Sequence, residues 1–391
     1  MGGVSPTTGK SVPPHGGRHV MEDWKAFLED RERRQLLRRL VPSSGRAPAL
    51  AVRDGREYVD FSSNDYLGLS SHPALVAAAR EALDRYGVGS GASRLMSGDL
   101  AIHHELEDVV AAFKGSEAAL VFNSGYQANT GILPALFGRR DAVFADQRCH
   151  ASQLDGALLS RAKLLRFRHN DPEHLERMLG KHRGAFERAL VMTESVFSMD
   201  GDLAPLAALL AACRRHRCLL MVDEAHATGV FGPQGRGCVE AEGLAGQVDL
   251  VMGTFSKALG GFGAYLAASR TVIDYLVNTA RSFIYSTALP PPVIAADLAA
   301  LRLCLSGETR GEELLRRAGA FRDALRGKGW TVGGESQIVP VVVGESALAV
   351  SLSKSLADQG FLALPVRPPT VPEGSARLRF SLTAAHTDRQ R

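Results

Sequence analysis

The stretches MVDEAHATG (residues 221–229) and TFSKALGGFG (residues 254–263) decide the fold of this chain. Each stretch follows a short, wholly apolar run, and such runs are typical of buried strands. A strand that ends in polar residues places their side chains in a pocket beyond its carboxyl end. The two strand ends together offer a carboxylate, an imidazole, hydroxyls and one lysine.

Apolar runs and helical patterns alternate over residues 118–252. We predict buried strands at 118–122, 142–145, 190–194, 219–222 and 250–252 and a helix at 204–216. This alternation predicts an α/β fold with a mostly parallel sheet that is covered on both faces. The glycines of residues 260–263 would let the chain turn back into a further strand at 264–268.

An anion site is predicted where the first of these strands ends. The run at 118–122 leads into NSGYQAN (residues 123–129) and then into a helical pattern. Backbone N–H groups at a helix N-terminus lack intrahelical partners and point at a bound anion. We predict that a phosphate binds the amides of Gly125 and Tyr126, although a tight strand-to-helix loop without a ligand has the same pattern.

The lysine of TFSKALGG, Lys257, needs assistance to act near neutral pH. With a reference pKa of about 10.4, only roughly one lysine in a few thousand is uncharged at pH 7, a cost of about 4 to 5 kcal/mol. An aldehyde cofactor removes this cost because it holds the nitrogen as an imine.

Five stretches, in order along the chain, resemble the α-oxoamine synthases, which are fold-type I pyridoxal phosphate enzymes. They are SSNDYLGLS (62–70), TESVFSMDGD (193–202), VDEAHATGVFGPQGRG (222–237), TFSKALGG (254–261) and RPPTVPEGSARLR (367–379). The resemblance extends over about residues 24–387. It implies a fold-type I transferase with a mostly parallel central sheet in a large domain, a smaller α+β C-terminal domain, and pyridoxal 5'-phosphate as cofactor.

The resemblance also implies roles for the polar residues at the strand ends. Lys257 would carry the imine, Asp223 would face the pyridine nitrogen, and His226 would bond to the phenolic oxygen. His150, in DQRCHAS, would stack on the cofactor ring and border the substrate. Cys149 stands where the family has a serine, so a role for that hydroxyl is not carried over.

Hydroxyl groups complete the implied cofactor site. Thr254 and Ser256 would donate to the phosphate, and Ser198 would lie near the phenolic oxygen. The family forms homodimers with active sites at the subunit boundary. Ser286 and Thr287, in RSFIYSTALPPP, would therefore reach the phosphate held by the partner subunit.

The implied substrates are an amino acid and an acyl thioester. Arg379 would bind the amino-acid carboxylate in a two-pronged contact, and Arg38, Asn64 and Thr370 would border the substrates. The stretch RPPTVP (367–372) favours the members that condense L-alanine with a pimeloyl thioester and release carbon dioxide. Side-chain chemistry leaves open glycine with acetyl or succinyl thioesters, and coenzyme A or an acyl carrier protein as acyl donor.

The sequence divides into four segments. We expect a disordered tail at 1–20, an N-terminal segment at 21–65 with a helix at 21–40 ended by Pro42 and a short strand at 58–61, a large domain at 66–290 and a small domain at 291–391. Within the small domain, helices are predicted at 293–305 and 312–325 and strands at 338–343 and 377–382. The family usually continues beyond AAHT (384–387) into a last helix, so an inactive cofactor-binding homologue stays an alternative.

Composition excludes several other classes of protein. The net charge of +4 without a long basic run does not indicate nucleic-acid binding, and no membrane association is expected. The stretch GVSPTTGKS (3–11) imitates a phosphate-binding loop, but Val4 stands where the loop requires its first glycine.

Five cysteines without a pairing pattern or signal peptide favour the cytoplasm. We expect no metal, because the spacing of Cys213, His216 and Cys218 does not suit zinc.

Overall fold

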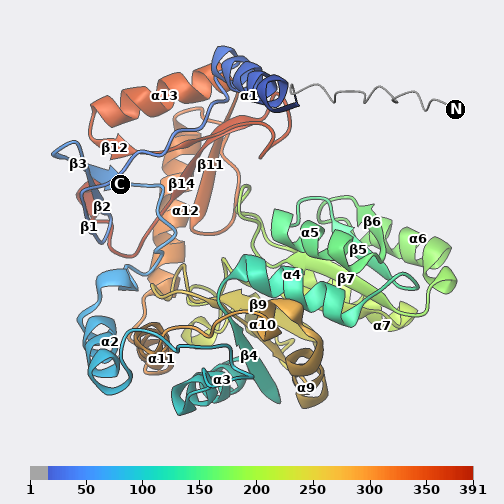
Figure 1. The fold of residues 1–391 in the computed structure, drawn as a ribbon. Coiled ribbons are helices and arrows are strands. Elements are labelled where there is room, and N and C mark those ends of the chain that lie inside the picture. Colours follow the sequence, from blue (N-terminus) through green and yellow to red (C-terminus); the bar gives the residue numbers. More distant parts are fainter. Residues whose placement is uncertain (1–15, 391) are drawn as a thin grey trace, which may run out of the picture.

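The computed structural model describes residues 16–390. A seven-stranded sheet forms the centre of the molecule (Figure 1). From edge to edge its strands are β4 (Ala118–Phe122), β10 (Ala264–Ala268), β9 (Leu250–Thr254), β8 (Leu219–Asp223), β7 (Ala189–Glu194), β5 (Ala142–Asp146) and β6 (Lys163–Phe167). The five neighbouring strands β9, β8, β7, β5 and β6 are parallel to one another. Strand β10 is antiparallel to both of its neighbours, β4 and β9. The predicted mostly parallel sheet is confirmed, and β8 and β9 end side by side.

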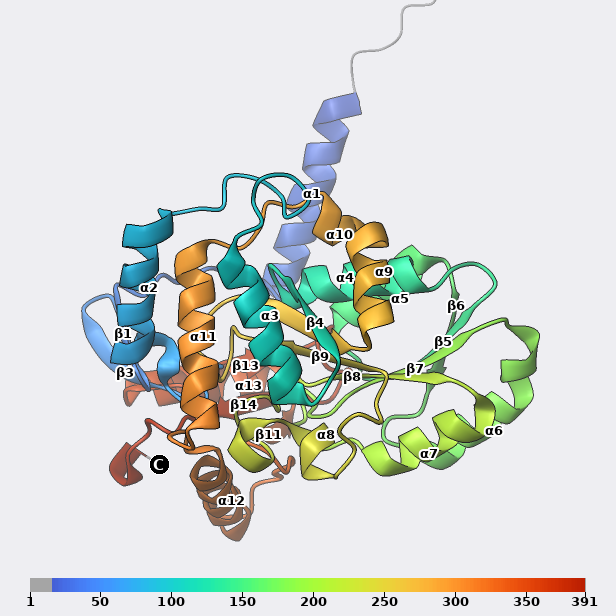
Figure 2. The ribbon, with the colours of Figure 1, turned by 90° about the horizontal axis from the view of Figure 1, so that it is seen from below.

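Each face of this sheet has its own hydrophobic core, because side chains alternate along every strand. In β8, Leu220 and Val222 enter one core and Met221 enters the other. Helices α3 (Ala101–Lys114), α6 (Pro172–His182), α7 (Leu206–His216) and α11 (Pro291–Leu305) contribute to the first core. Helices α4 (Gly125–Leu136), α5 (Ala151–Ser160), α9 (Arg270–Thr279) and α10 (Arg281–Ile284) contribute to the second, and Figure 2 shows the sheet between the two groups.

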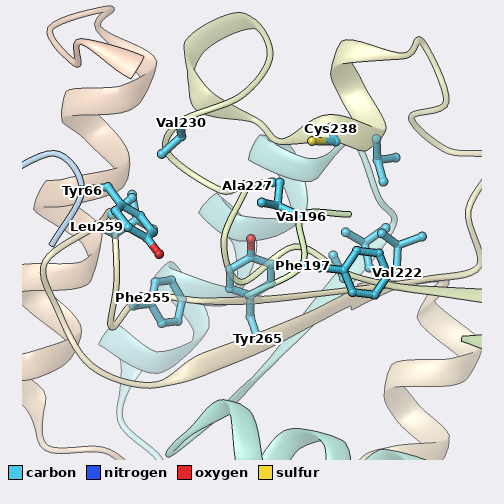
Figure 3. Close-up of a cluster of buried hydrophobic side chains, with 14 of the residues drawn as sticks. Tyr66, Val196, Phe197, Val222, Ala227, Val230, Cys238, Phe255, Leu259 and Tyr265 are labelled. Carbon is cyan, nitrogen blue, oxygen red and sulfur yellow. The ribbon is translucent and has the colours of Figure 1, made fainter. Parts of the chain in front are cut away.

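The larger of the two cores packs beneath the ends of β8 and β9, and Figure 3 shows some of its side chains. Tyr66, Phe255 and Tyr265 are fully buried in it, and the Phe255 and Tyr265 rings are 5.2 Å apart. Phe255 stands between Thr254 and the segment that carries Lys257. A densely packed interior resists displacement, so this core fixes where the lysine segment leaves the sheet.

The C-terminal part adds a three-stranded sheet of β11 (Ile338–Gly344), β14 (Ala376–Ser381) and β13 (Pro365–Val366), with helices α12 (Gly311–Gly327) and α13 (Ser346–Asp358). Of these elements, α12, β11 and β14 agree with the predicted helix at 312–325 and strands at 338–343 and 377–382, whereas α13 and β13 were not predicted. A second small sheet joins distant parts of the chain. Its strands β1 (Gly45–Ala47), β2 (Leu50–Arg53) and β3 (Arg56–Asp60) come from the N-terminal segment, and β12 (Phe361–Leu362) pairs with β3 in parallel.

The N-terminal helix differs from its prediction at both ends. Helix α1 (Gly16–Arg33) begins within the segment expected to be disordered and ends well before Pro42. Its end is set by Gln35, which adopts a left-handed conformation (φ 55°) while the Leu36 amide donates to the Arg31 carbonyl. This is a helix-terminating turn that glycine usually provides, so no glycine marked it in the sequence. The rest of the expected tail, and the stretch GVSPTTGKS, lie outside the described residues.

Two further α-helices complete the description of residues 16–390. Helix α2 (Pro73–Tyr86) packs against α11, and α8 (Cys238–Ala241) follows the stretch VDEAHATGVFGPQGRG. The prolines at 290–292 begin α11, with Pro290 as its N-cap. No helix among residues 16–390 combines the length and the apolar character that a membrane span requires.

Candidate active site

The two neighbouring strand ends bring Lys257 and His226 together. The segment after β9 turns back at Gly260, and its Lys257 Nζ lies 3.1 Å from His226 Nε2. Burial lowers the pKa of Lys257; the carboxylates of Asp223 and Glu194 oppose this shift, and Arg379 adds to it. A lysine in these surroundings is more readily deprotonated than one in water.

His226 is held in a neutral state between two partners. Burial lowers its pKa well below the usual value, and the charges of Lys257, Arg379 and His150 lower it further. Its Nδ1 lies 2.7 Å from the Tyr66 hydroxyl. A neutral imidazole donates at one nitrogen and accepts at the other. The hydroxyl and the amine therefore take opposite roles across the ring: when one donates, the other accepts.

Asp223, the last residue of β8, presents a buried carboxylate at the same edge. Its Oδ2 accepts a hydrogen bond of 3.3 Å from Asn129 of α4, and its Oδ1 accepts one of 2.9 Å from the Ala225 amide. Its charge raises the pKa of both Lys257 and His150. A buried carboxylate in this position is suited to pair with a cationic nitrogen.

The first turn of α4 has the features of an anion cradle. Ser124 caps the helix by accepting from the Gln127 amide, so the amides of Gly125 and Tyr126 at the first two positions are left for a ligand. A Cβ on Gly125 would lie 2.9 Å from Cγ2 of Thr254, and Thr254 Oγ1 is buried without a partner. An orphaned buried hydroxyl beside free amides suits a phosphate. Ser256 is exposed.

Ser286 and Thr287 also lie beside this cradle, within their own chain. Gln127 Nε2 donates to Ser286 Oγ at 2.6 Å, and Asn123 Nδ2 donates to the Thr287 carbonyl at 2.9 Å. A pocket lined by these four residues opens next to the start of α4. Whether their hydroxyls reach a partner subunit's phosphate stays a prediction.

Arg379 of β14 is a buried cation whose contacts are all neutral. Its Nε donates to the Ser198 carbonyl and its Nη1 to Ser381 Oγ, both at 2.5 Å. Its Nη2 lies 3.3 Å from Asn64 Oδ1 and 3.3 Å from the Tyr66 hydroxyl. Among the described residues no carboxylate forms an ion pair with it, so this guanidinium is free to bind an anionic ligand.

Cys149 and His150 directly precede helix α5. His150 is the N-cap of α5, and its Nδ1 accepts from the Ser152 amide at 3.2 Å. Its ring is partly withdrawn from water, which lowers its pKa, while Asp223 raises it and Lys257 lowers it. Cys149 is buried, with Sγ 3.4 Å from the Met192 carbonyl. The Cys149 thiol thus faces the interior.

Arg38 and Thr370 form a separate pair. Arg38 Nη2 donates to Thr370 Oγ1 at 3.0 Å, and both side chains are exposed. Thr370 lines a pocket that also includes Ser198 and Arg377. This exposed pair therefore lies beside the loop that contains Ser198, whose carbonyl accepts a hydrogen bond from Arg379.

Three contributors were not singled out from the sequence. Tyr66 connects His226, Asn64 and Arg379 through one hydroxyl. Glu194 ends β7 beside Asp223, and burial together with that neighbouring charge raises its pKa well above the usual value. Asn129 supports Asp223. A signal existed for Glu194, since it too is a carboxylate at the end of an apolar run, and Tyr66 stands inside SSNDYLGLS.

Together these residues fit pyridoxal 5'-phosphate. The fit rests on an amine with a lowered pKa, a buried carboxylate at the end of the neighbouring strand, and a phosphate cradle with an unpartnered hydroxyl. Comparison with known proteins agrees. The sequence profile of the aminotransferase class I and II family matches residues 56–391. This chain belongs to that family.

Relatives within the family carry a more specific name. A protein of Geobacter sulfurreducens named 8-amino-7-oxononanoate synthase is 54% identical over 364 residues, which are 92% of this chain and 93% of that protein. A protein of the same name from Gluconacetobacter diazotrophicus is 49% identical over 93% of each chain. The likeness to the α-oxoamine synthases is confirmed by these relatives.

Solved structures agree with the fold. A serine palmitoyltransferase from S. paucimobilis, solved with a bound PLP–myriocin aldimine, superposes with a TM-score of 0.90 at 33% identity, covering 96% of each chain. The 8-amino-7-oxononanoate synthase from Francisella tularensis gives a TM-score of 0.74 at 31% identity, covering 85% of this chain and 94% of the other.

Proposed function

We propose that this chain is a pyridoxal-phosphate-dependent acyltransferase that condenses L-alanine with a pimeloyl thioester and releases carbon dioxide. The product would be 8-amino-7-oxononanoate, an intermediate of biotin synthesis. The choice of reaction is supported by relatives of that name at 48 to 54% identity. The observation that carries the chemistry is the meeting of Lys257, His226 and Arg379 at the carboxyl edge of the sheet.

The cofactor is pyridoxal 5'-phosphate, which when bound supplies an electron sink for the bonds of the amino-acid α-carbon. The chain's own residues would hold it from three sides. The Gly125 and Tyr126 amides with Thr254 Oγ1 would bind the phosphate, Asp223 would pair with the ring nitrogen, and His150 would cover the ring. His226 would bond to the phenolic oxygen.

Lys257 is the group suited to move the α-proton. Its lowered pKa favours the neutral amine, and the neutral His226 ring beside it can donate to or accept from Nζ. The amine could then hold the proton that leaves the α-carbon.

Arg379 would bind the amino-acid carboxylate. It is a buried guanidinium whose present partners are a carbonyl, two hydroxyls and an amide oxygen, so an incoming carboxylate would supply the missing negative charge. A charge-assisted bond of this kind contributes about 1.5 to 3 kcal/mol. Asn64 would orient the guanidinium at the same time.

We also propose that the chain acts as a homodimer with active sites at the subunit boundary. Helix α1 supports this, because its large apolar side chains Trp24 and Phe27 are each 60% exposed. In a dimer, Ser286 and Thr287 would reach the phosphate held by the partner subunit. The pair of Arg38 with Thr370 would border the acyl substrate.

Product analysis tests the proposal. The purified enzyme with added cofactor is supplied with L-alanine, glycine or L-serine, each with pimeloyl, acetyl, succinyl or palmitoyl thioesters. L-Serine with a long acyl chain belongs in the set because the higher TM-score, 0.90, is to a serine palmitoyltransferase. We expect 8-amino-7-oxononanoate from L-alanine and the pimeloyl thioester to form fastest. A faster reaction with another pair would overturn the assignment.

A further inference from the structure

His169 bridges two carboxylates outside the site described above. Its Nδ1 lies 2.9 Å from Asp146 Oδ1, and its Nε2 lies 2.7 Å from Asp202 Oδ2. Ionised carboxylates only accept hydrogen bonds, so both ring nitrogens must carry a hydrogen to satisfy both contacts. The side chain is 14% exposed, and its ring stands edge-on to Phe197 with centroids 4.4 Å apart. These contacts fix the imidazole in one orientation.

The two carboxylates belong to separate parts of the active site. Asp146 ends β5, and its carbonyl accepts from the Cys149 amide, so it anchors the turn that leads to His150. Asp202 belongs to loop 195–203, which follows β7. The bridge therefore connects the segment of His150 to this loop.

Loop 195–203 in turn holds the arginines of β14. The Ser198 carbonyl accepts from Arg379 Nε, and the Met199 carbonyl and Asp200 accept from Arg377. Inside the loop, the Phe197 amide donates to the Asp202 carbonyl, so displacement of Asp202 is transmitted to Phe197 and Ser198. The anchoring of the loop therefore contributes to the orientation of the Arg379 guanidinium through the Ser198 carbonyl.

We propose that His169, by bridging Asp146 and Asp202, is a positioning residue that fixes loop 195–203 and, through the Ser198 carbonyl, the amino-acid-binding orientation of Arg379. The substrate part of this inference rests on the proposed function; the bridge itself does not.

The charges around the ring give the bridge a dependence on pH. Partial burial alone would lower the pKa of His169, but hydrogen bonds and charge from Asp146 and Asp202 raise it to about 9. The arginines of these segments have other partners: Arg148 and Arg377 pair with Asp200, Arg168 pairs with Asp171, and Arg166 donates to the Gln147 carbonyl. The bridge is therefore intact at neutral pH and lost as pH rises through about 9.

The test compares His169→Gln with His216→Gln in the holoenzyme. His216 is a matched control, because its Nε2 also bonds a carboxylate, Glu176 at 2.8 Å, at the end of α7 remote from the loop. We expect KM for L-alanine to rise about tenfold in His169→Gln with kcat changed far less, the effect of misplacing one charge-assisted contact. The parent should lose alanine affinity as pH rises through about 9, whereas His169→Gln should not.

Two further measurements keep the outcome decisive if His169→Gln folds poorly. In ring-labelled protein, the histidine NMR signal absent from His169→Gln should titrate near pH 9. Asp202→Asn, which keeps an acceptor oxygen but removes the charge, should move both that titration and the rise in KM to lower pH. Equal KM values and pH profiles for both glutamine variants, or titration near the reference value of about 6.5, would overturn the inference. A parent that makes no 8-amino-7-oxononanoate would instead refute the proposed function.

Discussion

Replacing Tyr66 with phenylalanine tests the hydrogen-bond network around the lysine most sharply. The substitution removes one hydroxyl that lies 2.7 Å from His226 Nδ1, 3.1 Å from Asn64 Oδ1 and 3.3 Å from Arg379 Nη2. Tyr66 is fully buried, so water cannot replace the lost partner without disturbing the core. A buried polar group left unsatisfied costs about 1 to 3 kcal/mol. That range corresponds to roughly a 5- to 150-fold fall in kcat/KM for L-alanine.

The assay is steady-state formation of the condensation product at several L-alanine concentrations. Tyr265→Phe is the control, since it removes an equally buried hydroxyl whose partner is Thr228 Oγ1 at 2.9 Å. Both variants should lose stability, but only Tyr66→Phe should lose catalytic efficiency. If Tyr66→Phe stays within about twofold of the parent, or falls no further than Tyr265→Phe, the network has no functional role.

Three other substitutions give separate predictions. Asp223→Ala should keep some cofactor, because the phosphate cradle and Lys257 still hold it. It should lose at least about a hundredfold in kcat, because breaking a buried ion pair costs about 3 to 5 kcal/mol. Cofactor absorbance measures the first effect and turnover measures the second. Arg379→Lys should raise KM for L-alanine by about tenfold or more while the cofactor spectrum is unchanged, because lysine lacks the planar fork; an unchanged KM would exclude Arg379 as the carboxylate ligand. His169 has a folded-state pKa of about 9, above its unfolded value of about 6.5. The stability it contributes, at most about 3 kcal/mol, is complete below about pH 6.5 and lost as pH rises through about 9, so urea unfolding of His169→Gln should show a smaller decline over that interval than the parent.

The buried strands could be predicted from the sequence because their side chains are apolar on both faces. Strands β4 and β10 have the predicted bounds, and β8 extends one residue beyond its predicted end. Strand β6 (KLLRF) was not predicted. It is an edge strand, only Phe167 is buried in it, and its charged residues interrupt the apolar run. Strands β1 and β2 were not predicted, because they are short and partly exposed and burial left little pattern in their residues. Strand β3 was predicted at 58–61, and it begins two residues earlier and ends one residue earlier.

The candidate site was predictable where a polar residue follows a buried strand, as at Asp223 and Thr254. Contacts between segments far apart in the sequence were not. Tyr66 meets His226 across 160 residues and Arg379 across 313 residues, and no local pattern encodes such a meeting. The same applies to His169, whose two carboxylates lie 23 and 33 residues away. These partners are set by the packing of whole elements.

The central claim is that Lys257 bonds covalently to pyridoxal 5'-phosphate. The most direct measurement is borohydride reduction of the purified enzyme with its cofactor, followed by peptide mass analysis. We predict a single phosphopyridoxyl label on the peptide containing TFSKALGG, at Lys257, and none in Lys257→Ala. Label spread over surface lysines, or label retained in Lys257→Ala, would contradict the account.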